Sequence, residues 1–156
     1  MILQIFKLHS YVIKLNKLIL ILMVVLLNLS LSILVSFISN YFFDSPLTEG
    51  FTEFGSHWEA FLLAVVIAPF LETLVLQYAI IETAKKSMST FFACLLSALI
   101  FGLLHFYNWF YFVYAILAGL LLAYLYIVGS LSKNGFLMTL IAHVLHNSTV
   151  FILSQL

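Results

Sequence analysis

The sequence contains no arginine, one cysteine and two prolines, and it has few charged residues of either sign. Only 8% of its 156 residues are charged, and 6 lysines balance 6 acidic residues. A nucleic-acid-binding surface needs clustered basic side chains to neutralise phosphates, so this composition excludes that class of protein. The single cysteine, Cys94, excludes a disulfide framework. Intrinsic disorder is excluded because it combines low hydrophobicity with high charge.

Apolar residues are what the chain has in abundance. They make up 65% of it, against roughly 45–50% in ordinary soluble domains. They form long continuous runs, whereas a β-barrel would show alternating segments of about 10 residues. We therefore predict an all-α, polytopic transmembrane helical bundle with about five spans. The expected spans are residues 18–38, 58–81, 91–106, 110–128 and 136–153.

The N-terminal segment, residues 1–17, mixes lysines with large apolar side chains. This mixture indicates an interfacial amphipathic lead-in or an extension of the first helix. The apolar run that follows has about 21 residues, longer than the usual 7–15 of a signal-peptide core, and no A-x-A-like site follows it. We therefore expect a retained anchor. Residues 1–57 would hold the lead-in, this anchor and an external loop, and residues 58–156 a four-helix core.

The positions of the lysines predict the orientation, because cytoplasmic loops are enriched in lysine and arginine. If the helices alternate in direction, every lysine falls on one side of the membrane. The loop 39–57 lies on the other side, and it contains acidic residues but no lysine. The sequence predicts a cytoplasmic N-terminus in a multi-pass cell-membrane protein, and the short loops favour a bacterial inner membrane. The lysines are Lys7, Lys14, Lys17, Lys85, Lys86 and Lys133.

A few strongly polar residues lie inside the predicted spans. An ionisable side chain at the bilayer centre costs at least about 2.5–3.5 kcal/mol on insertion scales, so it generally faces a cavity and has a function. Counting about 1.5 Å per residue from the cytoplasmic side puts four polar residues of three helices at depths of about 15 to 21 Å. They are Glu72, His105, His143 and Asn147.

These residue types suit amide hydrolysis without a covalent intermediate. A carboxylate with an imidazole can position a water molecule and remove its proton, while a second imidazole and a carboxamide can donate to a developing oxyanion. Nucleophilic catalysis is not favoured, because Cys94 and Ser97 have no base at helical spacing. A zinc site of Glu72 and histidines is the alternative. The sequence has no H-E-x-x-H motif, so we expect neither metal nor cofactor.

Other polar residues have structural interpretations. Asn28, on the first span, and Gln77, on the second, are expected to hydrogen-bond between helices. His146 is interpreted as a packing histidine or as a residue that supports the site from behind.

Three short segments in chain order carry a resemblance to a known family. They read P-F-L-E-T-L-V-L-Q (residues 69–77), F-G-L-L-H (residues 101–105) and H-V-L-H-N (residues 143–147). The sequence resembles the CPBP family of intramembrane proteases: the CAAX proteases and bacteriocin-processing (Abi) proteins, including the Ras-converting type of glutamate protease. That family carries E-E-x-x-x-R, F-x-x-x-H and H-x-x-x-N or H-x-x-x-D on successive helices. The resemblance covers about residues 58–153.

The resemblance implies roles for the four polar residues. Glu72 matches the first family glutamate, which activates water together with the histidine that His105 matches. His143 and Asn147 match the pair assigned to the oxyanion hole. His146 matches no motif position.

Two positions depart from the family pattern. Thr73 replaces the second glutamate and Gln77 replaces the arginine. Because the lost pair is oppositely charged, the two changes together leave no single buried charge unpaired. The two residues stand at i and i+4 and can hydrogen-bond to each other instead.

The leading hypothesis is an intramembrane endopeptidase that acts in the lipid bilayer on a peptide or lipidated-protein substrate, with Glu72 as general base. The alternative is a bacteriocin-immunity or membrane-interaction protein with little turnover. A third hypothesis is a small transporter or channel subunit in which Glu72 is a proton or cation site.

Overall fold

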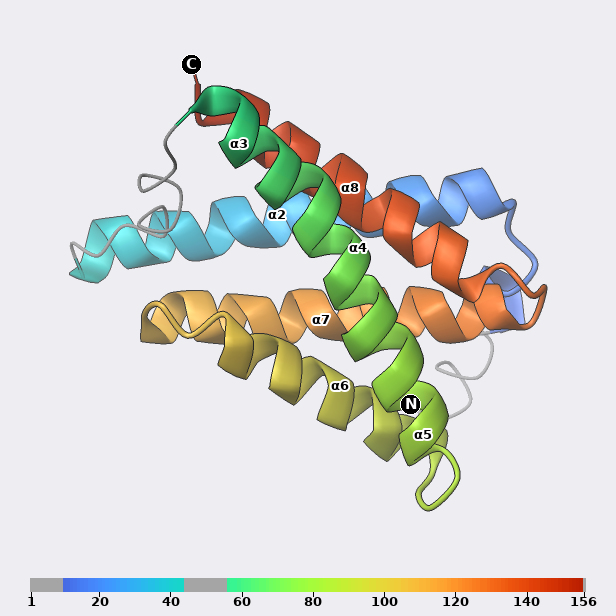
Figure 1. Ribbon diagram of the computed structural model, residues 1–156. Helices are drawn as coiled ribbons and strands as arrows, with labels where there is room; N and C mark the ends of the chain where they lie inside the picture. Colours follow the sequence, from blue (N-terminus) through green and yellow to red (C-terminus); the bar gives the residue numbers. More distant parts are fainter. Residues whose placement is uncertain (1–9, 44–55, 156) are drawn as a thin grey trace.

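The computed structural model describes residues 10–43 and 56–155, so Lys7 and the acidic residues predicted for the external loop lie outside the described residues. Within the described part, all regular elements are helical, which confirms the predicted all-α class (Figure 1). One long helix, from residue 57 to 84, consists of α-helical and π-helical (η) segments in turn. The elements are α2 (Lys17–Phe43), α3 (His57–Phe61), η1 (Leu62–Ile67), α4 (Ala68–Glu72), η2 (Thr73–Ile80), α5 (Ile81–Ala84), α6 (Thr90–Leu104), α7 (Trp109–Ser130) and α8 (Gly135–Leu153).

Four of these helices are long and apolar enough to cross a membrane: α2, the continuous α3–α5 helix, α7 and α8. The 15 residues of α6 span about 22 Å, which is less than the bilayer core of about 30 Å. The predicted third span ended two residues too late, because α6 ends at Leu104. The chain must turn there, since Asn108 already begins α7 by accepting a hydrogen bond from the Tyr111 N–H at 2.9 Å.

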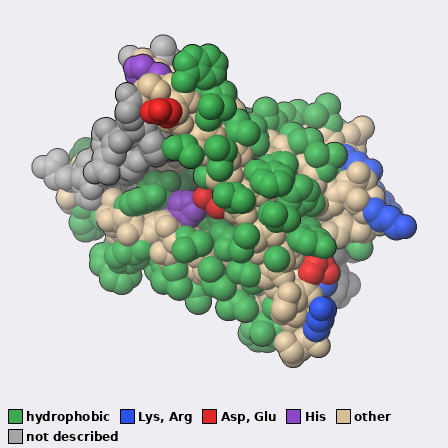
Figure 2. Space-filling view, in the orientation of Figure 1, with side chains coloured by type: hydrophobic (Ala, Val, Ile, Leu, Met, Phe, Trp, Pro, Cys, Tyr) green, Lys and Arg blue, Asp and Glu red, His purple; other side chains and the backbone are tan. Residues whose placement is uncertain are grey.

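The outer surface of the bundle is apolar, as expected where helices face lipid. Large hydrophobic side chains are exposed on every long helix, and green side chains cover most of the face in Figure 2. The lysines on this face gather at one end of the molecule. This distribution suits a protein whose two ends meet water and whose middle meets hydrocarbon.

The helices pack closely where small residues face each other. A Cβ added to Gly119 on α7 would lie 3.2 Å from the Cα of Ala98 on α6, so the two backbones are almost in contact. A Cβ on Gly129 would lie 2.9 Å from the Cα of Gly135, where the chain turns from α7 into α8. Small residues let helices approach closely in lipid. The small residues Ala98 and Gly119 therefore mark a close contact between α6 and α7.

The α8 helix has neighbours on two sides within the bundle. It packs against α2 and α7 on one side and against the continuous α3–α5 helix on the other (Figure 1). The α6 helix packs against α7 and η2. Polar side chains on α4, α6 and α8 can therefore meet in the interior.

Candidate active site

Glu72 lies at the centre of the candidate site, as the last residue of α4 and between the two π-helical segments. Its Oε1 atom is 3.5 Å from Nε2 of His105, and its Oε2 atom is 3.5 Å from Nε2 of His143. The side chain of Glu72 is 21% exposed, whereas that of His143 is 6% exposed. The carboxylate thus lies between two imidazoles of different helices, at the border between the interior and the surface.

His105 is held by the end of its own helix. It forms the C-terminal cap of α6, where its Nδ1 atom lies 2.8 Å from the Phe101 carbonyl oxygen. A carbonyl oxygen only accepts, so Nδ1 carries a hydrogen. In the neutral imidazole the lone pair is then on Nε2, which faces Glu72. The spacing of Phe101 and His105 at i and i+4 thus orients the imidazole and also satisfies a carbonyl at the helix end.

His143 is held by Thr73, one of the two residues that depart from the family pattern. The Oγ1 atom of Thr73 lies 3.4 Å from Nδ1 of His143, and Thr73 is fully buried. If the threonine hydroxyl donates, the hydrogen of a neutral His143 is on Nε2. In that case, two imidazoles with different hydrogen positions face the same carboxylate.

Gln77, the second departing residue, pairs with α6 rather than with Thr73. Its Oε1 atom lies 3.1 Å from the Ser97 Oγ, which also lies 2.8 Å from the Leu76 carbonyl oxygen. All of these side chains are buried. This contact agrees with the expectation that Gln77 hydrogen-bonds between helices. Thr73 and Gln77 do not pair with each other as suggested: Gln77 bonds to α6 and Thr73 to α8.

Asn147 stands one turn beyond His143 on α8 and binds the backbone of η1. Its Nδ2 atom donates to the Ala64 carbonyl at 2.8 Å. The cause is Pro69: the Ala68 N–H pairs five residues back with Leu63, and the same pattern would pair Ala64 with residue 69, which has no N–H. The proline leaves a carbonyl for Asn147, whose amide keeps a second N–H.

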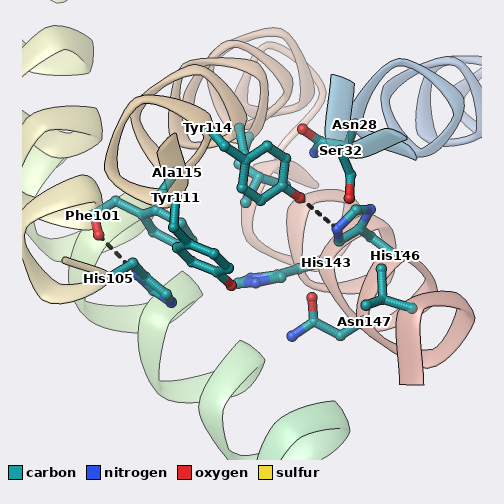
Figure 3. A pocket seen from close by; sticks show the side chains of 13 residues that line it. Asn28, Ser32, Phe101, His105, Tyr111, Tyr114, Ala115, His143, His146 and Asn147 are labelled. Carbon is teal, nitrogen blue, oxygen red and sulfur yellow. Dashed lines mark hydrogen bonds between the residues drawn. The ribbon is translucent and has the colours of Figure 1, made fainter. Parts of the chain in front are cut away.

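A cavity of about 110 Å³ opens beside these groups (Figure 3). His105, His143 and Asn147 line it, whereas Glu72 is not part of its wall. In Figure 2 a histidine and an acidic side chain lie next to each other in a hollow of the apolar face. Glu72 and His105 are in contact and both are partly exposed, so the site is reachable from the surface.

Five polar residues of the cavity wall were not among the predicted catalytic residues, although Asn28 and His146 had been given structural roles. They come from α2, α7 and α8, and the sequence showed one signal for the pair on α2, which stands at i and i+4 on one helix face. They are Asn28, Ser32, Tyr111, Tyr114 and His146.

Metal binding was the chemical alternative. Among residues 10–43 and 56–155, no three His, Cys, Asp or Glu side chains are arranged so that they could hold a metal ion. The expectation that the protein works without metal stays a prediction.

Comparison with known proteins gives one result. A family model described as type II CAAX prenyl endopeptidase Rce1-like matches residues 54–149. No curated protein and no solved structure matches the chain. The matched segment contains all three motifs and the groups around Glu72, and α2 lies outside it. The match confirms the resemblance to CAAX proteases, and the chain belongs to the type II CAAX prenyl endopeptidase Rce1-like family.

Proposed function

We propose that this protein is an intramembrane endopeptidase in which Glu72 activates the attacking water. The observation that carries the proposal is the position of the carboxylate, 3.5 Å from Nε2 of both His105 and His143. In a neutral His105 the lone pair of Nε2 faces the carboxylate, which also accepts. The carboxylate can accept one hydrogen of a water molecule that lies beside this pair, which is the arrangement a general base requires.

The reaction uses these groups in two steps. Glu72 takes a proton from the water as its oxygen bonds to the scissile carbonyl carbon, and the negative charge moves to the carbonyl oxygen. The Nε2–H of His143 and the free N–H of Asn147 donate to this oxyanion. The C–N bond then breaks, and the proton held by Glu72 passes to the leaving nitrogen. No covalent bond to the protein forms.

The substrate is a membrane-associated peptide or a lipidated protein. The family is described as prenyl endopeptidases, so a prenylated C-terminal peptide is the first substrate to test, and a bacteriocin-type peptide is the second. An apolar outer surface and a site within the helix bundle suit a substrate that arrives through lipid. We place the protein in a cell membrane with its lysine-rich end in the cytoplasm.

The test is Glu72→Gln, with Glu59→Gln as the matched control. Glu59 lies on the same continuous helix, in the exposed first turn of α3. Both chains are reconstituted in phospholipid vesicles, and cleavage of a farnesylated CAAX peptide is followed by mass spectrometry. We expect Glu72→Gln to lose about 10²–10⁴-fold in rate, the usual value of a general base. It should fold at least as well as the wild type, because a buried neutral amide costs less than a buried charge. Glu59→Gln should cleave normally.

One outcome would support the immunity-protein alternative. If neither wild type nor Glu72→Gln cleaves any membrane peptide, and both bind the same partner equally well, the site binds without turnover. The endopeptidase proposal would then be wrong.

A further inference from the structure

Tyr111 of α7 lines the cavity together with His105, His143 and Asn147, and the proposed mechanism does not use it. Figure 3 shows its ring extending from α7 toward the side of the cavity where His143 lies. The ring is nearly parallel to the imidazole of His105, with 6.2 Å between the ring centroids and 17° between the planes. The phenol is also close enough to the Glu72 carboxylate to interact with its charge. Tyr111 is therefore a neighbour of both groups around the proposed water.

The hydroxyl of Tyr111 has no hydrogen-bond partner in the described part of the chain. Figure 3 marks a hydrogen bond between Tyr114 and His146 and another at His105, but none at Tyr111. The Tyr111 side chain is half-buried, and its oxygen is not one of the described side-chain atoms that are both fully buried and unpaired. The oxygen is therefore open to the cavity, where an atom of a bound substrate can reach it. A phenol hydroxyl is a hydrogen-bond donor.

The surroundings of this hydroxyl suit a group that becomes negatively charged. The described residues that line the cavity include no lysine, so uncharged donors must stabilise the oxyanion there. The proposed mechanism supplies two of them, from His143 and Asn147. An oxyanion has three lone pairs and can accept from a third donor. Such a donor has a larger effect at a site that excludes most water than it has in bulk water.

We propose that Tyr111 is a further catalytic residue, whose hydroxyl donates a hydrogen bond to the carbonyl oxygen of the scissile peptide bond as negative charge develops on it. The oxyanion then has three uncharged donors, one from α7 and two from α8. This inference rests on the proposed endopeptidase function. It adds a residue that belongs to none of the three sequence motifs, and it gives α7 a part in the reaction.

The test is Tyr111→Phe, with Tyr107→Phe as the matched control. Tyr107 is exposed, its ring centroid is 5.1 Å from that of Tyr111, and it is not part of the cavity wall. The full chains are reconstituted in phospholipid vesicles with a farnesylated CAAX peptide. Tyr111→Phe retains the ring beside His105 and removes only the hydroxyl, so it should fold like the wild type. We expect kcat to fall about 10²–10³-fold, the value of one oxyanion donor, with little change in KM. Tyr107→Phe should cleave normally.

A second measurement needs no turnover. In a phosphinate analogue of the same peptide, a tetrahedral phosphorus with a charged oxygen replaces the scissile carbonyl. Tyr111→Phe should weaken binding of this analogue by about the factor that it removes from kcat/KM, because the analogue resembles the transition state. In a chain that also carries Glu72→Gln, which does not cleave, Tyr111→Phe should leave binding of the ordinary peptide unchanged.

The other results separate this proposal from the endopeptidase function. If Tyr111→Phe cleaves as fast as the wild type, loses its helical circular dichroism signal, or is no slower than Tyr107→Phe, the tyrosine proposal is wrong and the endopeptidase function stands. The same holds if the phosphinate and the ordinary peptide lose affinity equally. If the wild type cleaves nothing but binding of the phosphinate depends on the Tyr111 hydroxyl, the donor stands and the endopeptidase function is wrong. If the wild type neither cleaves the peptide nor binds the phosphinate, both are wrong.

Discussion

Thr73 shows how one residue can depart from a family motif and still serve the site. It stands where the family has a glutamate, and it is a small, neutral, buried side chain in contact with His143. A second carboxylate next to Glu72 would need a buried positive partner, and this sequence has no arginine to supply one. Threonine avoids that need and retains one hydroxyl that can orient the imidazole.

This contact predicts the behaviour of two substitutions at Thr73. Thr73→Val keeps the shape but removes the hydroxyl, so His143 loses the group that holds its hydrogen on Nε2. We expect a decrease in kcat of about three- to tenfold with little change in KM, the scale of one hydrogen bond. Thr73→Ser should restore the rate. Nitrogen NMR of His143 should show a mixed tautomer in Thr73→Val only. Equal rates and spectra in all three proteins would show that Thr73 only packs.

At the scale of the element, the glutamate helix is defined by its two π-helical segments. Such segments are rare and are frequently found at functional sites. Here the first segment ends next to Pro69, and the carbonyl of Ala64 that the proline leaves unpaired accepts the Asn147 amide. One sequence feature, Pro69, thus accounts for both the open carbonyl in the first π-helical segment and its hydrogen bond to α8.

Substitution of Pro69 by alanine tests this link. Pro69→Ala supplies an N–H for the Ala64 carbonyl and removes an interior proline that costs about 3 kcal/mol. We expect a higher Tm but slower cleavage, by about 10- to 100-fold, because Asn147 loses its anchor and small displacements of catalytic groups are costly.

Asn147→Ala provides the matched comparison. It leaves the Ala64 carbonyl unpaired, so it should lower both Tm and activity. The double variant Pro69→Ala/Asn147→Ala should regain Tm without regaining activity. If Asn147→Ala lowers Tm equally with and without Pro69, the link between proline and asparagine is wrong.

At the scale of the whole molecule, we expect that both folding and cleavage need no bound metal ion. Purification with a chelator should leave both the fold and the hydrolytic activity intact. The measurements are the helical circular dichroism signal, Tm and the cleavage rate before and after removal of metal. If the chelator abolishes cleavage, and one equivalent of zinc per chain restores it, the result would instead favour a metalloprotease with Glu72 and histidines as ligands.

The general architecture could be predicted because hydropathy is a strong one-dimensional signal. A span must hold about 20 apolar residues, and every predicted span corresponds to a helix whose ends differ by a few residues. Depth follows from the helical rise, so polar groups could be expected to meet at one level. The catalytic assignments of Glu72, His105, His143 and Asn147 remain predictions, although the structure places Glu72 between the two imidazoles.

The sequence by itself determined the helical class and the approximate bounds of the apolar helices. Only the tertiary structure decided which way each helix faces and which residues therefore come into contact. Asn147 contacts the Ala64 carbonyl, Thr73 contacts His143, and α2 contributes to the cavity wall. The physical reason is that lipid tails are as apolar as leucine, so in a membrane helix the lipid-facing and helix-facing sides look alike in sequence. Rotation and lateral position are set by packing and by hydrogen bonds to other helices. Those contacts join residues that are far apart in the chain.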